Sequence, residues 1–126
     1  MRKIIRTAKA PEPIGPYSQA VKVDKTLYVS GQISLDPETG DLVTGDIIME
    51  TKQVMENLSA ILKEANMEFN HVVKCSIFLK NMKDFQKINE IYGQYFDQIA
   101  PARETIEVSN LPKNVNVEIS CIAVEP

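Results

Sequence analysis

PARETIEVSNLPKNVNVEIS, residues 101–120, places two charged side chains inside expected strands. The strands run from about 103 to 108 and from 115 to 124, with a turn at Leu111-Pro112-Lys113 between them. Arg103 opens the first strand and Glu118 lies inside the second. A buried charge is costly without a partner, and the planar arginine fork can hold a carboxylate through two N–H bonds. The pattern indicates either a pocket for a small acidic molecule or a structural Arg103–Glu118 ion pair.

Two amphipathic helices are expected upstream, separated by a strand. The first follows Asp46 as N-cap, and the second follows Asn81 as N-cap, with Asp84 in its first turn. Residues 73–79 between them alternate in polarity, as in a half-buried strand. The apolar residues that recur at helical spacing are Val54, Leu58, Ile61, Leu62 and Ala65 in the first helix, and Phe85, Ile88, Tyr92, Tyr95, Phe96 and Ile99 in the second.

The first third of the chain predicts short strands and a stiff loop. A strand is expected at 4–7, and the prolines between 9 and 16 stiffen the loop that leads to Tyr17. Residues 19–23 and 27–33 predict a hairpin around Asp24-Lys25, and residues 36–40 predict a turn. Gly31 inside the second hairpin strand predicts a bulge or a close approach of another group to the backbone.

The order of these elements predicts an α+β fold in a single domain, residues 1–126. Two helices with one apolar face each are most simply accommodated on one side of a mixed sheet. Val117 and Ile119 alternate with Glu118 and Ser120, so the opposite face of the sheet is half polar. That face meets either water or another subunit, and we expect assembly.

The bulk composition is that of an ordinary globular protein, with 44% hydrophobic and 25% charged residues. A net charge of -3 without a basic run argues against nucleic-acid binding as the main function, and no apolar stretch approaches the roughly 20 residues of a membrane span. No apolar segment follows the first basic residues, so no secretory signal is expected. We expect Cys75 and Cys121 to be reduced, packed thiols of a cytoplasmic protein, His71 to be structural, and no metal site.

Several short motifs together resemble one family. They are Gly15-Pro16-Tyr17-Ser18, Ser30-Gly31-Gln32, Asn89, and the segment from Pro101-Ala102-Arg103 to Val117-Glu118-Ile119. In order and spacing, residues 10 to 124 are similar to the RidA family of reactive-intermediate imine deaminases. The resemblance implies a fold like AroH-type chorismate mutase, with a mixed β-sheet and two helices on one face. It also implies a homotrimeric barrel with ligand sites between neighbouring subunits.

The resemblance also implies a reaction and a set of site residues. Family members hydrolyse 2-imino or 2-enamino acids, such as the 2-aminoacrylate released by pyridoxal-phosphate enzymes, to 2-keto acids and ammonia. Neither a cofactor nor a metal is implied. By position, the residues implied as catalytic are Arg103 as carboxylate clamp, Glu118 as holder of the attacking water, and Tyr17 beside the substrate; those implied as substrate-binding are Ser30, Gly31, Asn89 and Thr105.

One departure from the family pattern follows the signature arginine. Many deaminases have a small residue and then Cys or Ala, whereas this chain has Glu104-Thr105. Strand alternation predicts that Thr105 shares a face with Arg103 and that Glu104 points away. The alternative function is a non-catalytic, trimeric, regulatory protein that binds small carboxylates. Ribonuclease and chaperone-like activities have also been assigned to some related proteins, and the acidic charge balance of this chain argues against RNA as a ligand.

Overall fold

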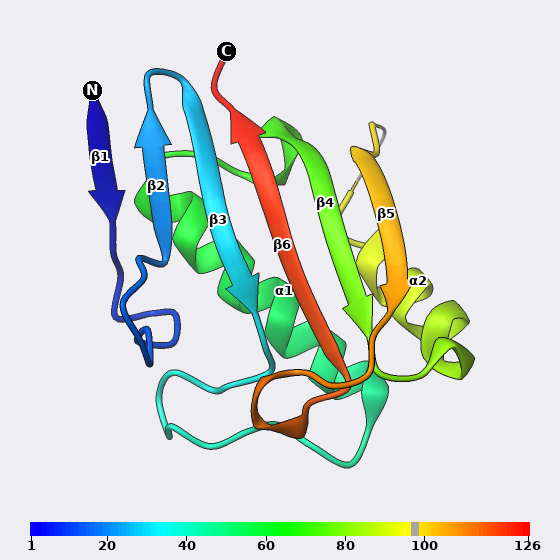
Figure 1. The fold of residues 1–126 in the computed structure, drawn as a ribbon. Coiled ribbons are helices and arrows are strands. Elements are labelled where there is room, and N and C mark those ends of the chain that lie inside the picture. Colours follow the sequence, from blue (N-terminus) through cyan, green and yellow to red (C-terminus); the bar gives the residue numbers. More distant parts are fainter. Residues whose placement is uncertain (97–98) are drawn as a thin grey trace.

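The C-terminal strand lies in the interior of a six-stranded sheet, with a neighbouring strand on each side (Figure 1). The computed structural model describes residues 1–96 and 99–126. The order of strands across the sheet is β1-β2-β3-β6-β4-β5. The elements of the described part, in chain order, are β1 (Arg2–Ile5), β2 (Ala20–Val23), β3 (Thr26–Gln32), α1 (Ile47–Glu64), β4 (Val72–Leu79), α2 (Phe85–Gly93), β5 (Ala102–Glu107) and β6 (Val117–Val124).

The sheet is mixed because of one parallel pair. Strands β4 and β5 run parallel, and the other neighbouring pairs are antiparallel. A parallel pair needs a crossover connection, and the segment that contains α2 supplies it. Strand β6 pairs with β3 on one side and with β4 on the other. It therefore joins the N-terminal three strands to the β4-α2-β5 unit.

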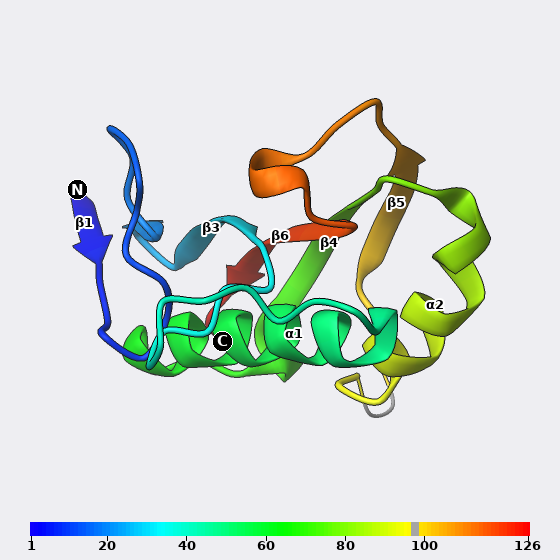
Figure 2. The same ribbon diagram turned by 90° about the horizontal axis from the view of Figure 1, so that it is seen from below.

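Both helices cover the same face of this sheet (Figure 2). The apolar stripe expected on α1 is buried in full, and it packs on β3 and β6. The inward residues of β6 are Val117, Ile119, Cys121 and Ala123, all buried. The predicted α+β arrangement, with two helices on one face of a mixed sheet, is confirmed. The opposite face has no α-helix over it in the described part of the chain.

The ends of the two helices differ in how well the pattern predicted them. Asp46 caps α1 as expected, since its carboxylate accepts a hydrogen bond from the Ile48 amide at 2.9 Å. Asn81 caps a short 3₁₀ turn, Met82–Asp84, that leads into α2. The expectation that the second helix includes Tyr95, Phe96 and Ile99 is wrong. The helix ends at Gly93, and Ile99 is 84% exposed. Positions 97 and 98 of the expected helix lie outside the described residues.

Strand limits were also approximate. The first strand covers Arg2–Ile5 instead of 4–7, and the last begins at Val117 instead of 115 because a 3₁₀ turn, Pro112–Asn114, precedes it. Val73 is exposed, because a register shift between Val72 and Lys74 turns it away from the core. The hairpin around Asp24-Lys25 is confirmed by antiparallel pairing of β2 and β3.

Candidate functional site

The two charged residues of the C-terminal segment lie on opposite faces of the sheet. Arg103 is opposite Cys75 in the register of β4 and β5, and Cys75 is part of the core beneath the helices. Glu118 alternates with the buried Val117 and Ile119, so it points to the open face. A structural ion pair between Arg103 and Glu118 within one chain is therefore excluded. The candidate site consists of two halves, which one copy of the chain does not bring together.

The first half-site is Arg103 of β5 together with the residues of α2 that contact it. The Nη1 atom of Arg103 donates a hydrogen bond to Oδ1 of Asn89 at 2.5 Å. The guanidinium carbon lies 5.7 Å from the centre of the Phe85 ring and 5.1 Å from that of Tyr92, within the range of cation–π attraction. Phe85, Asn89 and Tyr92 are spaced i, i+4 and i+7, so they lie along one face of the helix. Asn89, which is predicted to bind substrate, contacts the arginine through its side-chain oxygen.

Thr105 shares the face of Arg103, as alternation predicted, because it lies opposite Ile77. Its hydroxyl oxygen is buried, and no hydrogen-bond partner for it is found among the described residues. The Tyr92 hydroxyl is in the same condition. Burial raises the pKa of that phenol, and it also raises the pKa of the neighbouring Cys75 thiol. The Thr105 and Tyr92 hydroxyl oxygens on the face of Arg103 are thus removed from solvent.

Glu118 and Gly31 form the centre of the second half-site. A Cβ atom placed on Gly31 would lie 2.3 Å from Oε2 of Glu118 and 2.7 Å from its Cδ. The carboxylate therefore lies directly over the Gly31 backbone. The pairing of β3 with β6 also shifts register between Val29 and Gln32. Both alternatives predicted for this glycine, a bulge and a close approach, are confirmed. Burial raises the pKa of the Glu118 carboxyl above its usual range.

Tyr17 and Ser30 border the same half-site. They line a cavity of about 380 Å³ together with Gly31 and Glu118, and its remaining lining residues, Ile14, Ile33 and Pro112, are apolar. The Tyr17 side chain is 50% exposed, and its hydroxyl accepts a 3.4 Å hydrogen bond from the Ile14 amide. The structure therefore brings together four of the predicted site residues. Glu118 supplies the negative charge among the cavity's lining residues.

The Ser30 hydroxyl has a structural contact that its sequence does not reveal. It donates a 2.6 Å hydrogen bond to the carbonyl of Ser18, and the Ser30 amide bonds the carbonyl of Gln19 at 2.9 Å. These contacts join β3 to the segment that carries Tyr17. An expected ligand interaction of the Ser30 oxygen would therefore use its lone pairs, because its proton is engaged.

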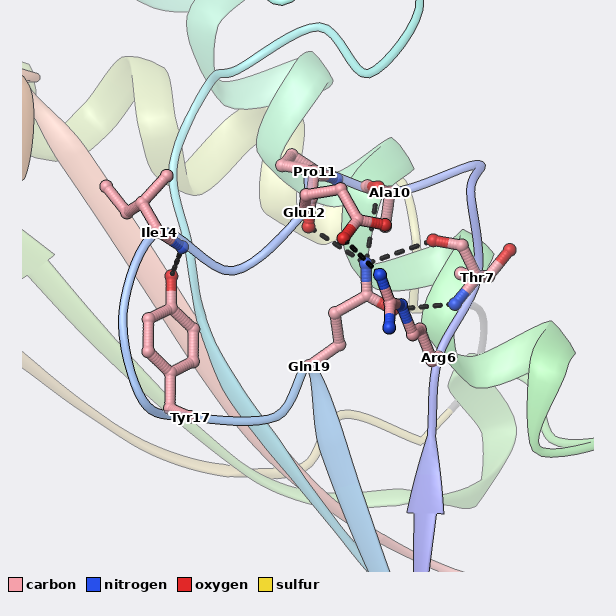
Figure 3. A network of polar contacts seen from close by, with 8 residues as sticks. All are labelled: Arg6, Thr7, Ala10, Pro11, Glu12, Ile14, Tyr17 and Gln19. Carbon is pink, nitrogen blue, oxygen red and sulfur yellow. Dashed lines mark hydrogen bonds and ion pairs between the residues drawn. The ribbon is translucent and has the colours of Figure 1, made fainter.

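Gln19 fixes the loop that leads to Tyr17 (Figure 3). Its side-chain oxygen accepts from the Thr7 amide at 2.7 Å. Its Nε2 atom donates to the carbonyls of Thr7, Ala10 and Pro11 at 3.0, 3.2 and 2.8 Å. The residue is only 2% exposed. Sequence reasoning missed this role, since a glutamine at the start of a strand carries no signal of four loop contacts.

Two further buried polar residues were missed for the same reason. Glu50, 1% exposed, accepts hydrogen bonds from the amide and the side chain of Asn116 at 2.8 and 3.1 Å. Asn57 on α1 donates to the carbonyls of Ile33 and Leu35 at 3.0 and 2.9 Å. These residues tie α1 to the segment before β6 and to the segment after β3.

Glu104 points to the open face, as alternation predicted. Its carboxylate accepts a hydrogen bond from the Ser76 hydroxyl and pairs with Lys74 at 2.9 Å. The Ser76 hydrogen bond and then the Lys74 ammonium lower the pKa of this carboxyl. Of the two residues that depart from the family pattern, Glu104 thus lies on the face opposite Arg103, whereas Thr105 shares the face of the arginine. The contacts of the Glu104 carboxylate are with Ser76 and Lys74, not with Arg103.

The cysteines and the histidine have the predicted surroundings. Cys75 and Cys121 are buried free thiols, opposite each other in the β4–β6 register. His71 accepts a hydrogen bond from the Glu68 amide at 3.0 Å within a 3₁₀ turn. Across residues 1–96 and 99–126, no group of three or more His, Cys, Asp or Glu side chains is arranged to hold a metal ion. No helix of that part is long and apolar enough to cross a bilayer.

Comparison with known proteins assigns the family. A model of the family described as Endoribonuclease L-PSP matches residues 7–125. A 2-iminobutanoate/2-iminopropanoate deaminase of Mus musculus is 52% identical over 125 residues, which cover 99% of this chain and 93% of that protein. A RutC family protein of Pyrococcus abyssi is 53% identical over 122 residues, covering 97% and 96%. The chain belongs to the RidA family.

Solved structures of RidA-family proteins agree with the fold. A Yersinia pestis protein of the conserved Rid family has a TM-score of 0.97 at 46% identity, covering 99% of this chain and 100% of that one. E. coli TdcF, solved with bound serine, has a TM-score of 0.94 at 38% identity, covering 98% and 99%. The family-level expectation of the fold is therefore confirmed. The ligand of TdcF is a small molecule with a carboxylate.

Proposed function

We propose that this RidA-family protein hydrolyses 2-imino and 2-enamino acids, such as 2-iminobutanoate and 2-iminopropanoate, to 2-keto acids and ammonia. About half of its residues are identical to those of relatives named for this reaction in mouse and human, along nearly the whole chain. The observation that carries the proposal is the desolvated Glu118 carboxylate, which lines the same cavity as Tyr17. The Arg103 guanidinium lies on the other face of the sheet. A carboxylate clamp and a proton acceptor are the two groups this hydrolysis requires.

The separation of these groups implies where the site is completed. Arg103 and Glu118 lie on opposite faces of one sheet, so they act together only across two copies of the chain. A homotrimer with its open sheet faces inward and its sites between subunits supplies that arrangement. The cavity beside Glu118 would then be closed by the edge of a neighbouring subunit, where β5 and α2 carry the arginine.

The reaction follows from the two half-sites. Arg103 holds the substrate carboxylate and thereby fixes the position of the imine carbon. Water adds to the carbon of the protonated imine while Glu118 accepts one proton of the water, which forms a neutral carbinolamine. Glu118 then gives this proton to the nitrogen. The C–N bond breaks and releases ammonia as Glu118 takes the hydroxyl proton, and transfer of that proton to ammonia leaves the 2-keto acid and ammonium as products. A raised carboxyl pKa suits this work, because desolvation makes the ionised carboxylate a stronger proton acceptor.

Two groups on the open face complete the proposed mechanism. Tyr17 borders the cavity beside Glu118 and limits its width, and the apolar residues of the lining keep competing water away from the reacting carbon. Serine bound to TdcF supports a ligand that carries a carboxylate and a nitrogen on the adjacent carbon.

The test is a coupled assay in which a serine/threonine dehydratase generates 2-aminoacrylate or 2-aminocrotonate. Formation of the keto acid is followed with wild type, with Arg103→Ala and without added protein. We expect acceleration by wild type and a loss of at least about a hundredfold in kcat/KM for Arg103→Ala, since a charged binding partner is removed. Equal traces from all three, with a correctly folded protein, would overturn the proposal.

A second candidate is a regulatory protein that binds small carboxylates without turnover. The serine complex of TdcF is compatible with it. Glu118 distinguishes the two, because a carboxylate ligand gains nothing from a second carboxylate beside it. Under either function, Glu118→Gln should bind a keto acid at least as tightly as wild type. If the protein is a deaminase, wild type turns over substrate and the variant does not, whereas a regulatory protein shows no turnover in either form.

A further inference from the structure

The face of α2 beside Arg103 carries two aromatic rings and an asparagine, and apolar periodicity alone does not explain this choice of residues. Phe85 and Tyr92 were expected only as core residues of an amphipathic helix. Both rings belong to or pack against the core, and each also presents a face to the guanidinium, with the ring centres 5.7 and 5.1 Å from Cζ. Between them Asn89 accepts the hydrogen bond from Nη1. The arginine therefore has three partners from one helix face.

We propose that Phe85 and Tyr92 are positioning residues for the reaction, which hold the plane of the Arg103 guanidinium ready for the substrate carboxylate. The inference rests on the proposed function, because it assigns a task to the clamp of that same site. A guanidinium binds a carboxylate through two parallel N–H groups, so the tilt of its plane determines whether both bonds form.

The physical need for such a device lies in the length of the side chain. A free arginine samples many rotamers, and fixing them on ligand binding lowers the affinity. Attraction to two ring faces limits those rotamers before the ligand arrives, and it leaves the N–H groups at the edge of the plane available. Asn89 uses one of the five donors of the guanidinium. Rings are suited to this work because they hold the flat cation without consuming its donors.

The two rings differ in how they are supported. Tyr92 is 5% exposed and packs on Phe96, with ring centres 4.8 Å apart. Its ring is therefore a fixed wall. Phe85 is the first residue of α2 and is only partly buried, so it can be replaced with less risk to the fold. The two positions thus allow a test in which one variant removes a ring and another keeps it.

The experiment measures binding of 2-oxobutanoate, the stable keto-acid product, by calorimetry, together with kcat and KM in the coupled assay. Phe85→Leu keeps apolar volume but removes the ring. We expect it to weaken 2-oxobutanoate binding about 3- to 30-fold, with KM rising in parallel and kcat nearly unchanged. Phe85→Tyr should restore wild-type binding, and Tyr92→Phe should stay within about twofold of it because the ring is retained.

The matched control is Phe69→Leu. Phe69 packs on Tyr95 and Phe96 on the helix side of the sheet, and no cation–π contact joins it to Arg103 among the described residues. The Phe69→Leu protein should bind 2-oxobutanoate as tightly as wild type does. A second readout is the NMR shift of the Arg103 side-chain protons, which the rings move upfield and which Phe85→Leu should partly reverse.

The outcomes separate this inference from the function on which it rests. If Arg103→Ala binds 2-oxobutanoate as tightly as wild type, the arginine clamp itself is wrong. If Arg103→Ala loses binding while Phe85→Leu stays within about twofold of wild type, the clamp stands and the positioning role is wrong. Equal weakening in Phe69→Leu and Phe85→Leu would also overturn it, since general loosening of the packing would then explain both.

Discussion

The two faces of the sheet use their polar residues in opposite ways. On the helix-covered side, Glu50 and Asn57 are buried and fully engaged by backbone or side-chain partners. On the open side, Glu118 is partly buried beside a cavity, with its pKa raised by desolvation. A polar group that is buried and satisfied stabilises the fold, while one that is desolvated and available for a ligand costs stability. The difference separates the residues that build this protein from those proposed to act.

Arg103 is a polar residue of the helix-covered face that is also proposed to act on the substrate. It lies on the helix side, yet it is at the edge strand β5 and keeps hydrogen-bonding capacity beyond its contact with Asn89. If it acts with a Glu118 from another subunit, two inactive variants should complement each other. Arg103→Ala and Glu118→Gln proteins, mixed in equal amounts and reassembled, should recover about a quarter of wild-type turnover, because a quarter of the subunit interfaces then hold both intact residues.

Native mass spectrometry supplies the control for this experiment by measuring how far the subunits exchange. Turnover that stays at background in a fully exchanged mixture would show that both residues act from one copy of the chain. The comparison between the two faces would then lose its functional meaning.

Gly31→Ala tests the open face alone. The added Cβ would lie 2.3 Å from the Glu118 carboxylate, so that side chain must move. We expect kcat to fall about 10- to 100-fold, since misplacement of a catalytic group by about 1 Å has costs of this order. Gly93→Ala is the matched control, because nothing lies within 4 Å of a Cβ at that position. Full activity in Gly31→Ala would mean that the position of Glu118 does not limit turnover.

Asn57→Ala tests the helix-covered side, where the change should affect stability instead of rate. It leaves the carbonyls of Ile33 and Leu35 without their donor. We expect a loss of about 2–3 kcal/mol in the free energy of unfolding, with kcat within about twofold of wild type. Lys52→Ala, an exposed change on the same helix, should stay within about 0.5 kcal/mol. Denaturant titration and the coupled assay measure the two effects, and a purely kinetic defect would contradict the contrast.

Glu118→Gln should have the smallest effect on stability, and in the opposite direction. Burial raises the pKa of Glu118 in the folded state above its unfolded value. Protonation of this group therefore favours the folded state, fully so below the unfolded pKa, and this contribution is lost as the pH rises through the folded pKa. At pH 7 the ionised carboxylate therefore destabilises the fold, and the neutral amide should raise Tm. The gain should vanish at about pH 3, where Glu118 is largely protonated in both states. Thermal unfolding at the two pH values measures this, and a gain that does not depend on pH would contradict the origin proposed here.

Much of the fold could be read from short-range patterns. The spacing of Val54, Leu58 and Ile61 predicted α1 and its buried stripe, and Asp46 was identified as its cap. Limits of elements were less accurate, because tertiary contacts decide where a helix stops. Phe96 is buried although α2 ends at Gly93, so its apolar character indicated burial but not helix. Val73 alternated correctly in sequence and was turned outward by a register shift that only pairing with β6 reveals.

The sequence by itself determined the α+β class, the positions of the strands and helices, the family, and the identity of the arginine and the glutamate. Periodicity and motif spacing are local properties, so they can be recognised without coordinates. Only the tertiary structure decided that Arg103 and Glu118 lie on opposite faces, that the Glu118 carboxylate lies over Gly31, and that two rings of α2 face the guanidinium. Each of these depends on the order and register of strands far apart in the chain, and no local pattern encodes which residues that pairing makes neighbours.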